Sequence, residues 1–139
     1  MKFLFKLFMG LHVFVYRLTG GKLGSEMRGF KVLILTTKGR KSGKIFSNPV
    51  GYFERDGGYI IVASNNGQDN HPAWYHNIKG NPADVMIQAK DKKMKVKPEI
   101  ILGEPRKPLW SWIVSIAPNF GDYEKQTTRK IPLVFLKPQ

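Results

Sequence analysis

A glycine- and cation-rich turn between two β-prone segments is the feature that most limits what this chain can fold into. The turn, residues 36–44, holds two glycines and four cations, and it joins the apolar run 32–35 to a second run that begins at Ile45. Runs of this kind on either side of a turn predict two neighbouring strands, with the cations at their connection.

The composition of this turn suits a phosphate group. Glycines allow the backbone to approach an anion, Arg40 can form two parallel hydrogen bonds with it, and Lys38, Lys41 and Lys44 add positive charge. The turn therefore predicts a phosphate-binding loop. The alternative is a solvated cationic hairpin tip, and these residues alone leave it open.

Strand signals continue to the C-terminus, with short helices between them. We expect six strands, over 30–37, 45–53, 59–64, 83–89, 92–102 and 131–136, and helices over 71–79, 104–117 and 120–128. Pro108 is expected to confine the regular part of the second helix to the residues after it. Short connections without regular βαβ alternation favour a small barrel over a doubly wound sheet, so the predicted class is α+β, mainly β.

Residues 1–18 are apolar except for a few polar side chains. At about 100° per residue, Lys2, Lys6 and Arg17 fall in one sector, which predicts an amphipathic helix. The run is interrupted too often to span a bilayer comfortably, and no signal-peptide cleavage site follows it. Two interpretations stay open: a helix at the cytoplasmic membrane surface, or a helix that caps the domain's own core. We expect residues 1–24 to form this helix and a joint, and residues 25–139 to form the barrel.

Length and composition narrow the remaining choices. The 139 residues suffice for one domain with a real core, and the absence of cysteine excludes disulfides and cysteine-ligated metals. Cysteine-free composition fits a reducing compartment, so the expected location is the cytoplasm, with peripheral binding to the inner membrane face if the first helix lies there. A net charge of +13 attracts phosphates, acidic tails, nucleic acid or anionic lipid.

The side chains offer little reaction chemistry of their own. His71 and His76 are five residues apart, which places them on different faces of a helix rather than on one metal ion. The ten acidic residues form no spaced pair in an apolar frame, so an enzyme of this sequence needs a cofactor that carries the reaction. Trp74 and Tyr75 offer flat surfaces for a ring system, or they pack in the core.

A series of short motifs occurs in one order along the chain. These are Leu35-Thr36-Thr37-Lys38-Gly39-Arg40-Lys41-Ser42-Gly43, Asn48-Pro49, Arg55-Asp56-Gly57-Gly58, Val62-Ala63-Ser64, His71-Pro72-Ala73-Trp74-Tyr75-His76-Asn77, Asn81-Pro82, Asp122-Tyr123 and Ile131-Pro132. From about residue 30 to residue 137 they resemble the deazaflavin-dependent nitroreductase family. The resemblance implies an FMN-binding-like split β-barrel of six to seven strands. It also implies binding of coenzyme F420, a deazaflavin with a phosphodiester and an acidic polyglutamate tail.

The resemblance also implies roles for individual residues. A phosphate group would be held by Arg40, Lys41 and Ser42, and one wall of the cofactor site would be formed by Phe46, Ser47, Asn48, Pro49 and Val50. The deazaflavin edge would meet Val62, Ala63, Ser64 and Asn65, and the ring would be enclosed by Ala73, Trp74, Tyr75, His76 and Asn77. Phe120 and Tyr123 would border the substrate, and Tyr123, Ser64 or water would supply a proton.

Two positions depart from the pattern of this family. Relatives commonly carry Lys-Gly-Gly where this chain has Asn65-Asn66-Gly67, which removes one cation near the anionic end of the coenzyme. The prodrug-activating nitroreductases carry several tyrosines in the closing segment, where this chain keeps only Tyr123.

The expected function is hydride transfer from the reduced deazaflavin to an electron-poor small molecule. A quinone, an activated alkene or a nitroaromatic fits this role, and the amphipathic first helix favours a lipid-soluble quinone. One alternative is a similar barrel that binds FMN. Another is a non-catalytic basic module for anionic lipid or nucleic acid, although the sequence lacks an RNA-binding aromatic signature and a helix-turn-helix, so no nucleic-acid partner is expected. The oligomeric state is not predicted.

Overall fold

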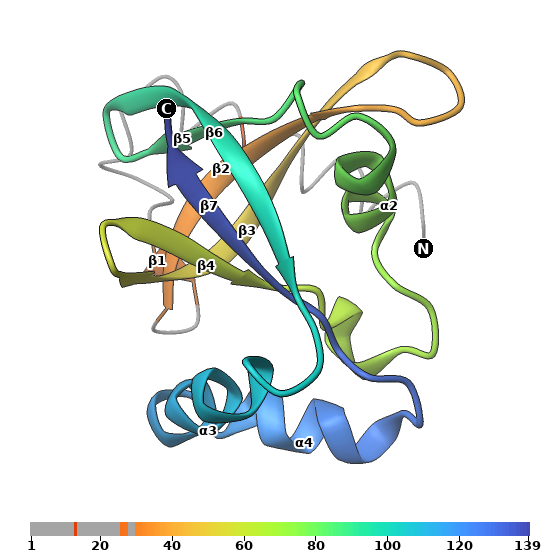
Figure 1. The fold of residues 1–139 in the computed structure, drawn as a ribbon, viewed down its shortest axis with the longest axis vertical. Coiled ribbons are helices and arrows are strands. Elements are labelled where there is room, and N and C mark those ends of the chain that lie inside the picture. The colour runs from red at the N-terminus through yellow and green to blue at the C-terminus, as the bar shows by residue number, and fades with distance from the viewer. Residues whose placement is uncertain (1–12, 14–25, 28–29) are drawn as a thin grey trace.

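The computed structural model describes residue 13, residues 26–27 and residues 30–139 (Figure 1). The predicted N-terminal helix and joint, residues 1–24, therefore lie outside the described residues except for Val13. Within the described part of the chain, no helix is both long enough and apolar enough to cross a bilayer.

The strands form one antiparallel sheet that closes on itself. The strands are β1 (Glu26–Met27), β2 (Phe30–Lys38), β3 (Ile45–Arg55), β4 (Gly58–Val62), β5 (Met86–Ala89), β6 (Lys92–Ile101) and β7 (Leu133–Pro138). Their order is β1-β2-β3-β4-β7-β6-β5, and β5 also pairs with β2. This last pairing closes six strands into a barrel and confirms the predicted fold class.

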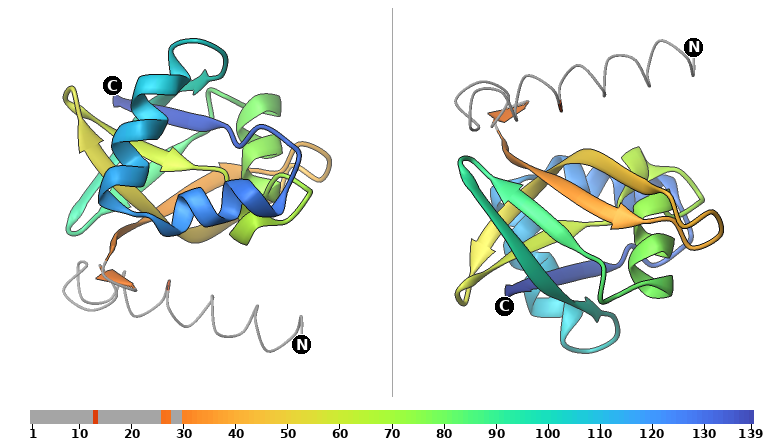
Figure 2. Two further views of the ribbon diagram at one scale, coloured as in Figure 1. Left: turned by 90° about the horizontal axis from the view of Figure 1, so that it is seen from below. Right: turned by 90° about the horizontal axis from the view of Figure 1, so that it is seen from above.

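Within residues 30–139, four short helices occupy the connections between strands. They are the 3₁₀ helix η1 (Asn65–Gly67), α2 (Ala73–Gly80), α3 (Arg106–Ile116) and α4 (Asn119–Gln126). Figure 2 shows α3 and α4 adjoining one another at one end of the barrel, whereas α2 lies beside the loop that joins β2 to β3. One end of the barrel is thus covered by α3 and α4, and the cationic β2–β3 loop meets α2 elsewhere on the barrel.

The predicted strands and helices are observed with bounds shifted by a few residues, and two of the differences have a clear physical reason. The strand expected over 83–89 is shortened to β5, because the backbone N–H of Asp84 donates to the carbonyl of Asn81 and forms a turn there. The expectation that α3 would become regular only after Pro108 is wrong, since α3 begins at Arg106. Pro108 lies in the first turn, where a missing backbone N–H costs no intrahelical hydrogen bond.

The core lies on both faces of β4. Leu33, Leu35 and Ile61 belong to the cluster that fills the barrel, whereas Ile60 and Val62 belong to a second cluster beneath α3. Strands buried on both faces are apolar at nearly every position, which explains the uninterrupted apolar run that contains β4. The β4 strand is therefore held rigidly, and the loop that follows it starts from a fixed point.

A buried arginine joins the two helices to the barrel. Arg106 of α3 donates from Nε to the carbonyl of Ile131 at 2.7 Å, and its Nη2 lies 3.6 Å from Oε2 of Glu124 in α4. The guanidinium also lies 4.3 Å from the centroid of the Trp110 ring. Burial lowers the pKa of Arg106, and Glu124 opposes that shift. These contacts fix α4 relative to the segment that leads into β7.

Candidate functional site

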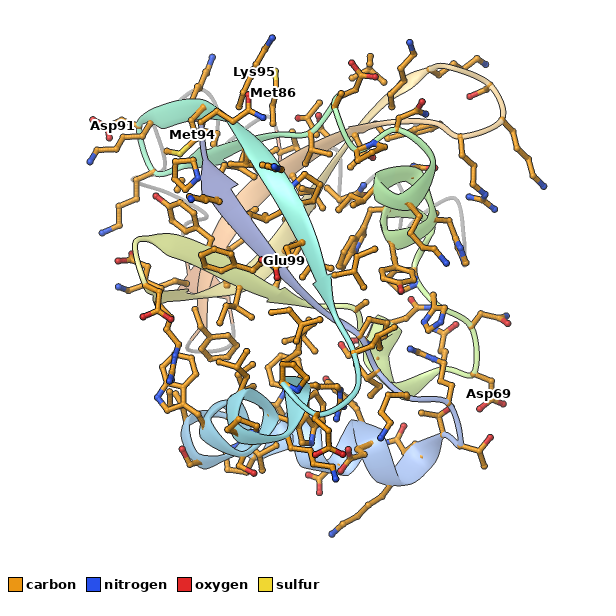
Figure 3. All side chains as sticks on the ribbon, in the orientation of Figure 1. Asp69, Met86, Asp91, Met94, Lys95 and Glu99 are labelled. Carbon is orange, nitrogen blue, oxygen red and sulfur yellow. The ribbon has the colours of Figure 1, made fainter. Side chains whose placement is uncertain are left out.

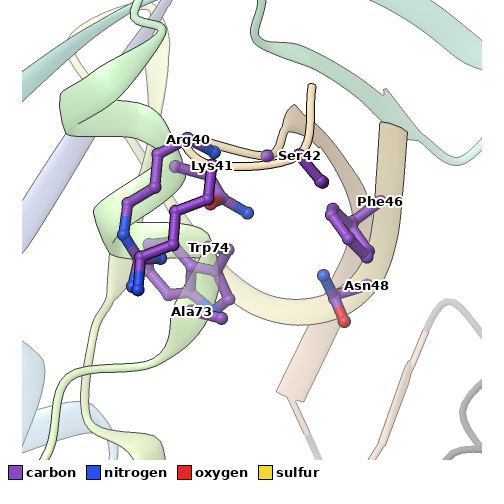
Figure 4. Close-up of a pocket in the computed structure, with 9 residues that line it drawn as sticks. Arg40, Lys41, Ser42, Phe46, Asn48, Ala73 and Trp74 are labelled. Atoms are coloured by element: carbon purple, nitrogen blue, oxygen red, sulfur yellow. The ribbon is translucent and has the colours of Figure 1, made fainter. Parts of the chain in front are cut away.

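A cavity of about 270 Å³ lies between the β2–β3 loop and α2 (Figure 4). Arg40 and Lys41 lie on the side of α2, whereas Phe46 and Asn48 of β3 lie on the opposite side. The residues that line the cavity are Gly39, Arg40, Lys41, Ser42, Phe46, Asn48, Ala73, Trp74 and Asn77. The structure thus brings the predicted phosphate loop and the predicted ring-binding helix to one cavity.

Internal hydrogen bonds hold the β2–β3 loop in a compact shape. The backbone N–H of Gly39 donates to the carbonyl of Lys44 at 2.7 Å, and that of Gly43 donates to the carbonyl of Gly39 at 3.0 Å. Gly43 has a positive φ of 73°, which favours glycine. A Cβ on Gly39 would lie 2.8 Å from the Ser42 hydroxyl and 2.9 Å from the Phe46 ring. Both glycines of the motif are therefore required by the shape of the loop.

Two asparagines attach this loop to α2. Asn77, which is 5% exposed, accepts a hydrogen bond from the backbone N–H of Arg40 at 3.2 Å and donates to the hydroxyl of Thr37 at 3.3 Å. Asn81 donates to the carbonyl of Lys38 at 3.1 Å. The Asn77 amide is thus engaged by the protein, so its role in the site is to position the backbone of Arg40.

The cations of the loop face solvent at the mouth of the cavity. Arg40, Lys41 and Lys44 are exposed, and none of the ion pairs found between described residues involves them. The positive charge of Arg40 contributes to a lowered pKa at His76, after the larger effect of burial. Exposed guanidinium and ammonium groups on a loop held by the protein are suited to an anion such as a phosphate.

The remaining predicted site residues do not line this cavity. Ser47 and Pro49 alternate with Phe46 and Asn48 along β3, and Ser47 instead contacts the Thr36 hydroxyl at 2.9 Å. The others are buried or half-buried in the core, lie in the loop after β4, or lie on α2 or α4 away from the lining: Val50, Val62, Ala63, Ser64, Asn65, Tyr75, His76, Phe120 and Tyr123. The backbone N–H of Ala63 is already bonded to the carbonyl of Pro132 at 3.0 Å.

The loop after β4 has an unusual backbone that accounts for its sequence. Asn65, Asn66 and Gly67 have φ values of 48°, 55° and 78°. Asparagine and glycine enter this left-handed region more readily than other residues. A Cβ on Gly67 would lie 2.6 Å from Oε1 of Gln126 in α4. The Asn-Asn-Gly sequence thus gives the loop its shape and its close approach to α4.

Arg129 also holds this loop, although no pattern in the sequence predicts a role for it. Its Nε donates to the carbonyl of Gln68 at 2.9 Å, its Nη2 donates to the carbonyl of Ser64 at 2.8 Å, and its Nη1 lies 2.8 Å from Nδ1 of His71. Burial lowers the pKa of Arg129, and Asp69 opposes the shift. No local pattern marks Arg129, because its partners lie about 60 residues earlier, as the separations of 58, 61 and 65 residues show.

His71 and His76 lie closer together than their spacing in the sequence predicts. Their ring centroids are 5.7 Å apart, because His71 precedes α2 instead of lying within it. The expectation that they would diverge on a helix is therefore wrong. The described residues nevertheless contain no group of three side chains suited to a metal ion. The pKa of His71 is lowered by burial first and then by Arg129, His76 and Lys79.

Comparisons with known proteins match nearly the whole chain to one enzyme family. A sequence model of the F420H(2)-dependent quinone reductase family matches residues 8–138. The F420H(2)-dependent quinone reductase Rv1261c of Mycobacterium tuberculosis is 34% identical over 132 residues, which is 91% of this chain and 87% of that protein.

Two solved structures of similar sequence also superpose on this chain. A structure described as an F420-H2 dependent reductase (FDR-A) superposes with a TM-score of 0.68 at 36% identity, over 76% of this chain and 93% of that one. Another, described as a domain-swapped dimer, superposes with a TM-score of 0.71 at 32% identity, over 92% of this chain and 93% of that one.

Proposed function

Because this chain belongs to the F420H(2)-dependent quinone reductase family, we propose that it binds coenzyme F420 in the cavity beside the β2–β3 loop. The protein is a deazaflavin-dependent oxidoreductase, and its hydride acceptor is a small molecule of the quinone class. When bound, the reduced coenzyme supplies the hydride. The chain's own residues therefore bind the coenzyme, orient the acceptor and supply a proton to the reduced acceptor.

The β2–β3 loop fits the anionic part of the coenzyme. Arg40, Lys41 and Ser42 surround one end of the cavity, and the hydrogen bond from Arg40 N–H to Asn77 holds the loop before any ligand binds. A preorganised loop loses little conformational freedom on binding. The single observation that carries the proposal is that exposed loop cations and the Trp74 indole line one cavity.

The other end of the cavity fits part of a flat ring system. Trp74, Ala73 and Phe46 give it apolar walls, and Asn48 adds one amide. Pockets for small molecules typically combine apolar walls with a few placed polar groups. At about 270 Å³ the cavity is close to the lower end of the usual size range, so it holds a phosphate and part of a ring.

Ser64 and Tyr123 are the proposed sources of a proton for the reduced acceptor. Ser64 follows β4 and is buried, with its carbonyl held by Arg129, whereas Tyr123 lies on α4 with its ring 5.8 Å from that of Phe120. Both lie on elements that the barrel and Arg106 hold in place. Each would contribute a hydroxyl group, held in a fixed position, that can donate a proton.

Access to a lipid-soluble quinone would be direct if the protein binds the inner face of the cell membrane through residues 1–18. The amphipathic pattern of these residues supports this part of the proposal. Val13, the described residue of this segment, is buried against Ile34 of β2. This contact places Val13 itself against the barrel.

Two titrations test the proposal. Coenzyme F420 and FMN are added separately to the purified protein, and the change in cofactor fluorescence gives each affinity. We expect F420 to bind at least tenfold more tightly than FMN, and the protein with reduced F420 to convert a water-soluble quinone to its quinol. Preferential FMN binding, or no turnover of any quinone, would contradict it.

A further inference from the structure

The outer face of β6 and β7 carries a row of lysines outside the coenzyme cavity. Val96 is buried inside the barrel, so its neighbours Lys95 and Lys97 point to the opposite, outer face of β6, together with Lys93. Lys137 of β7 lies directly opposite Lys97 in the strand register. We call these lysines and Met86, which lies opposite Lys95, the cationic sheet face: Lys93, Lys95, Lys97, Lys137 and Met86.

The positive charge of this face is not balanced within the described part of the chain. Its four lysines are exposed, and they take part in none of the ion pairs between described residues. Lys97 and Lys137 repel one another, because like charges directly opposite on neighbouring strands destabilise a sheet. The acidic residues of β6 and its hairpin turn, Glu99 and Asp91, lie beyond the two ends of the row (Figure 3). An anionic partner would remove this repulsion.

An exposed methionine lies among these lysines. Met86 of β5 is 41% exposed, and Figure 3 shows it beside Lys95 at the same corner of the barrel. Lysine side chains that surround an apolar side chain suit a lipid interface, where the ammonium groups meet headgroups and the apolar atoms enter the boundary below them. A nucleic acid gains much less from an exposed methionine than a bilayer does.

The cationic sheet face adjoins the place on β2 where Val13 packs against the barrel. Met86 pairs with Thr36 of β2, and two residues earlier on the same face of β2 lies Ile34, against which Val13 is buried. The lysine row and residue 13 therefore share one side of the barrel.

We infer that the cationic sheet face docks on an anionic phospholipid bilayer. The face forms a binding surface made by the barrel itself, separate from residues 1–18 and from the coenzyme site. It orients the barrel on the membrane, whereas a terminal helix alone would only tether it. The lipid that it recognises is a bilayer rich in anionic headgroups, and neutral lipid offers it no counter-charge.

The test compares the wild-type protein with two variants that lose the same charge. K93Q/K95Q/K97Q removes lysines from the cationic sheet face, whereas K107Q/K125Q/K130Q removes exposed lysines from α3, α4 and the segment after α4. Binding is measured by co-sedimentation with mixed phosphatidylglycerol and phosphatidylcholine vesicles, and with phosphatidylcholine vesicles. F420 affinity and the unfolding temperature are measured on the same samples.

A lysine near an anionic surface contributes about 1 kcal/mol, so K93Q/K95Q/K97Q should bind the anionic vesicles on the order of 100-fold less tightly than wild type. The control variant should lose far less affinity for the anionic vesicles. The two variants should not differ in their binding to neutral vesicles. An unchanged F420 affinity in K93Q/K95Q/K97Q separates this result from any failure of the coenzyme site. Its unfolding temperature should not fall, because the Lys97–Lys137 repulsion is removed.

Equal losses of affinity for anionic vesicles in the two variants would overturn the inference, because the net charge of the whole protein would then explain binding. Wild-type binding by K93Q/K95Q/K97Q would overturn it too. Tighter binding of the wild-type protein to single-stranded RNA than to anionic vesicles, lost in K93Q/K95Q/K97Q, would assign the face to nucleic acid instead.

Discussion

Nη1 of Arg129 lies 2.8 Å from Nδ1 of His71, although the two residues are 58 positions apart in the sequence. An arginine can only donate, so Nδ1 of His71 accepts, and the neutral imidazole carries its proton on Nε2. The same guanidinium donates to the carbonyls of Ser64 and Gln68. One side chain from the segment before β7 thus determines the shape of the loop between β4 and α2.

Replacing Arg129 with lysine should loosen this loop. A lysine retains the charge, but a single ammonium cannot reproduce the forked contacts to Ser64, Gln68 and His71. We expect a loss of about 1–3 kcal/mol in the free energy of unfolding and a lower kcat for quinone reduction. Urea unfolding and steady-state kinetics measure the two effects. The neighbouring exposed change K130Q is the control, and equal behaviour of the two variants would contradict the role of Arg129.

Stability should fall as the pH is lowered through the range in which histidine titrates. The pKa values of His71 and His76 are lowered in the folded protein, both mainly by burial. Below the unfolded pKa of about 6.5, the unfolded chain therefore binds more protons than the folded chain, so protons favour unfolding. The unfolding free energy should decrease from pH 7.5 to pH 5.5, as measured by urea titrations at each pH.

The variant H71Q separates the contribution of His71 from that of His76. Glutamine can still accept a hydrogen bond from Arg129, but it does not titrate. H71Q should therefore show a shallower decrease in stability over the same pH range, with little change at pH 7.5. A slope identical to that of the wild-type protein would show that His71 does not contribute.

The barrel and the cationic loop could be predicted because their signals are local. The apolar run of β4 and the glycines and cations of residues 38–44 each lie within a few neighbouring residues. The turn chemistry of Gly39 and Gly43 and the alternation along β6 needed no knowledge of distant contacts. A small barrel was predicted from six strands with short connections and from the family resemblance, whereas the closing pair of β2 with β5 was not predicted.

The contacts that shape the site could not be predicted in the same way. Asn77 reaches Arg40 across 37 residues, and Arg129 reaches Ser64 across 65, and no periodic pattern encodes such pairs. The family resemblance indicated that Asn77 belongs to the site, but it could not show that its amide is engaged by the loop backbone. Val62 and Ala63 lie in the core because β4 is buried on both faces.

Removal of two loop cations tests the phosphate site directly. Arg40 and Lys41 line the cavity and are exposed, so R40A/K41A should not unfold the protein. Charge-assisted hydrogen bonds contribute about 1.5–3 kcal/mol each, so the affinity for F420 should fall by at least about 100-fold. Fluorescence titration measures it. The variant K107A/K125A loses the same charge far from the cavity, and a comparable loss of affinity there would contradict the assignment.

Asn77 should support coenzyme binding without touching the coenzyme's phosphate. In N77A the backbone N–H of Arg40 and the hydroxyl of Thr37 lose their partner, at a cost of about 1–3 kcal/mol in unfolding free energy. The loop would then be held mainly by Asn81, and F420 affinity should fall because ordering the loop must accompany binding. Saturating F420 should therefore raise the unfolding temperature of N77A less than that of the wild-type protein. Affinity equal to wild type in a destabilised N77A would show that the loop needs no support from α2.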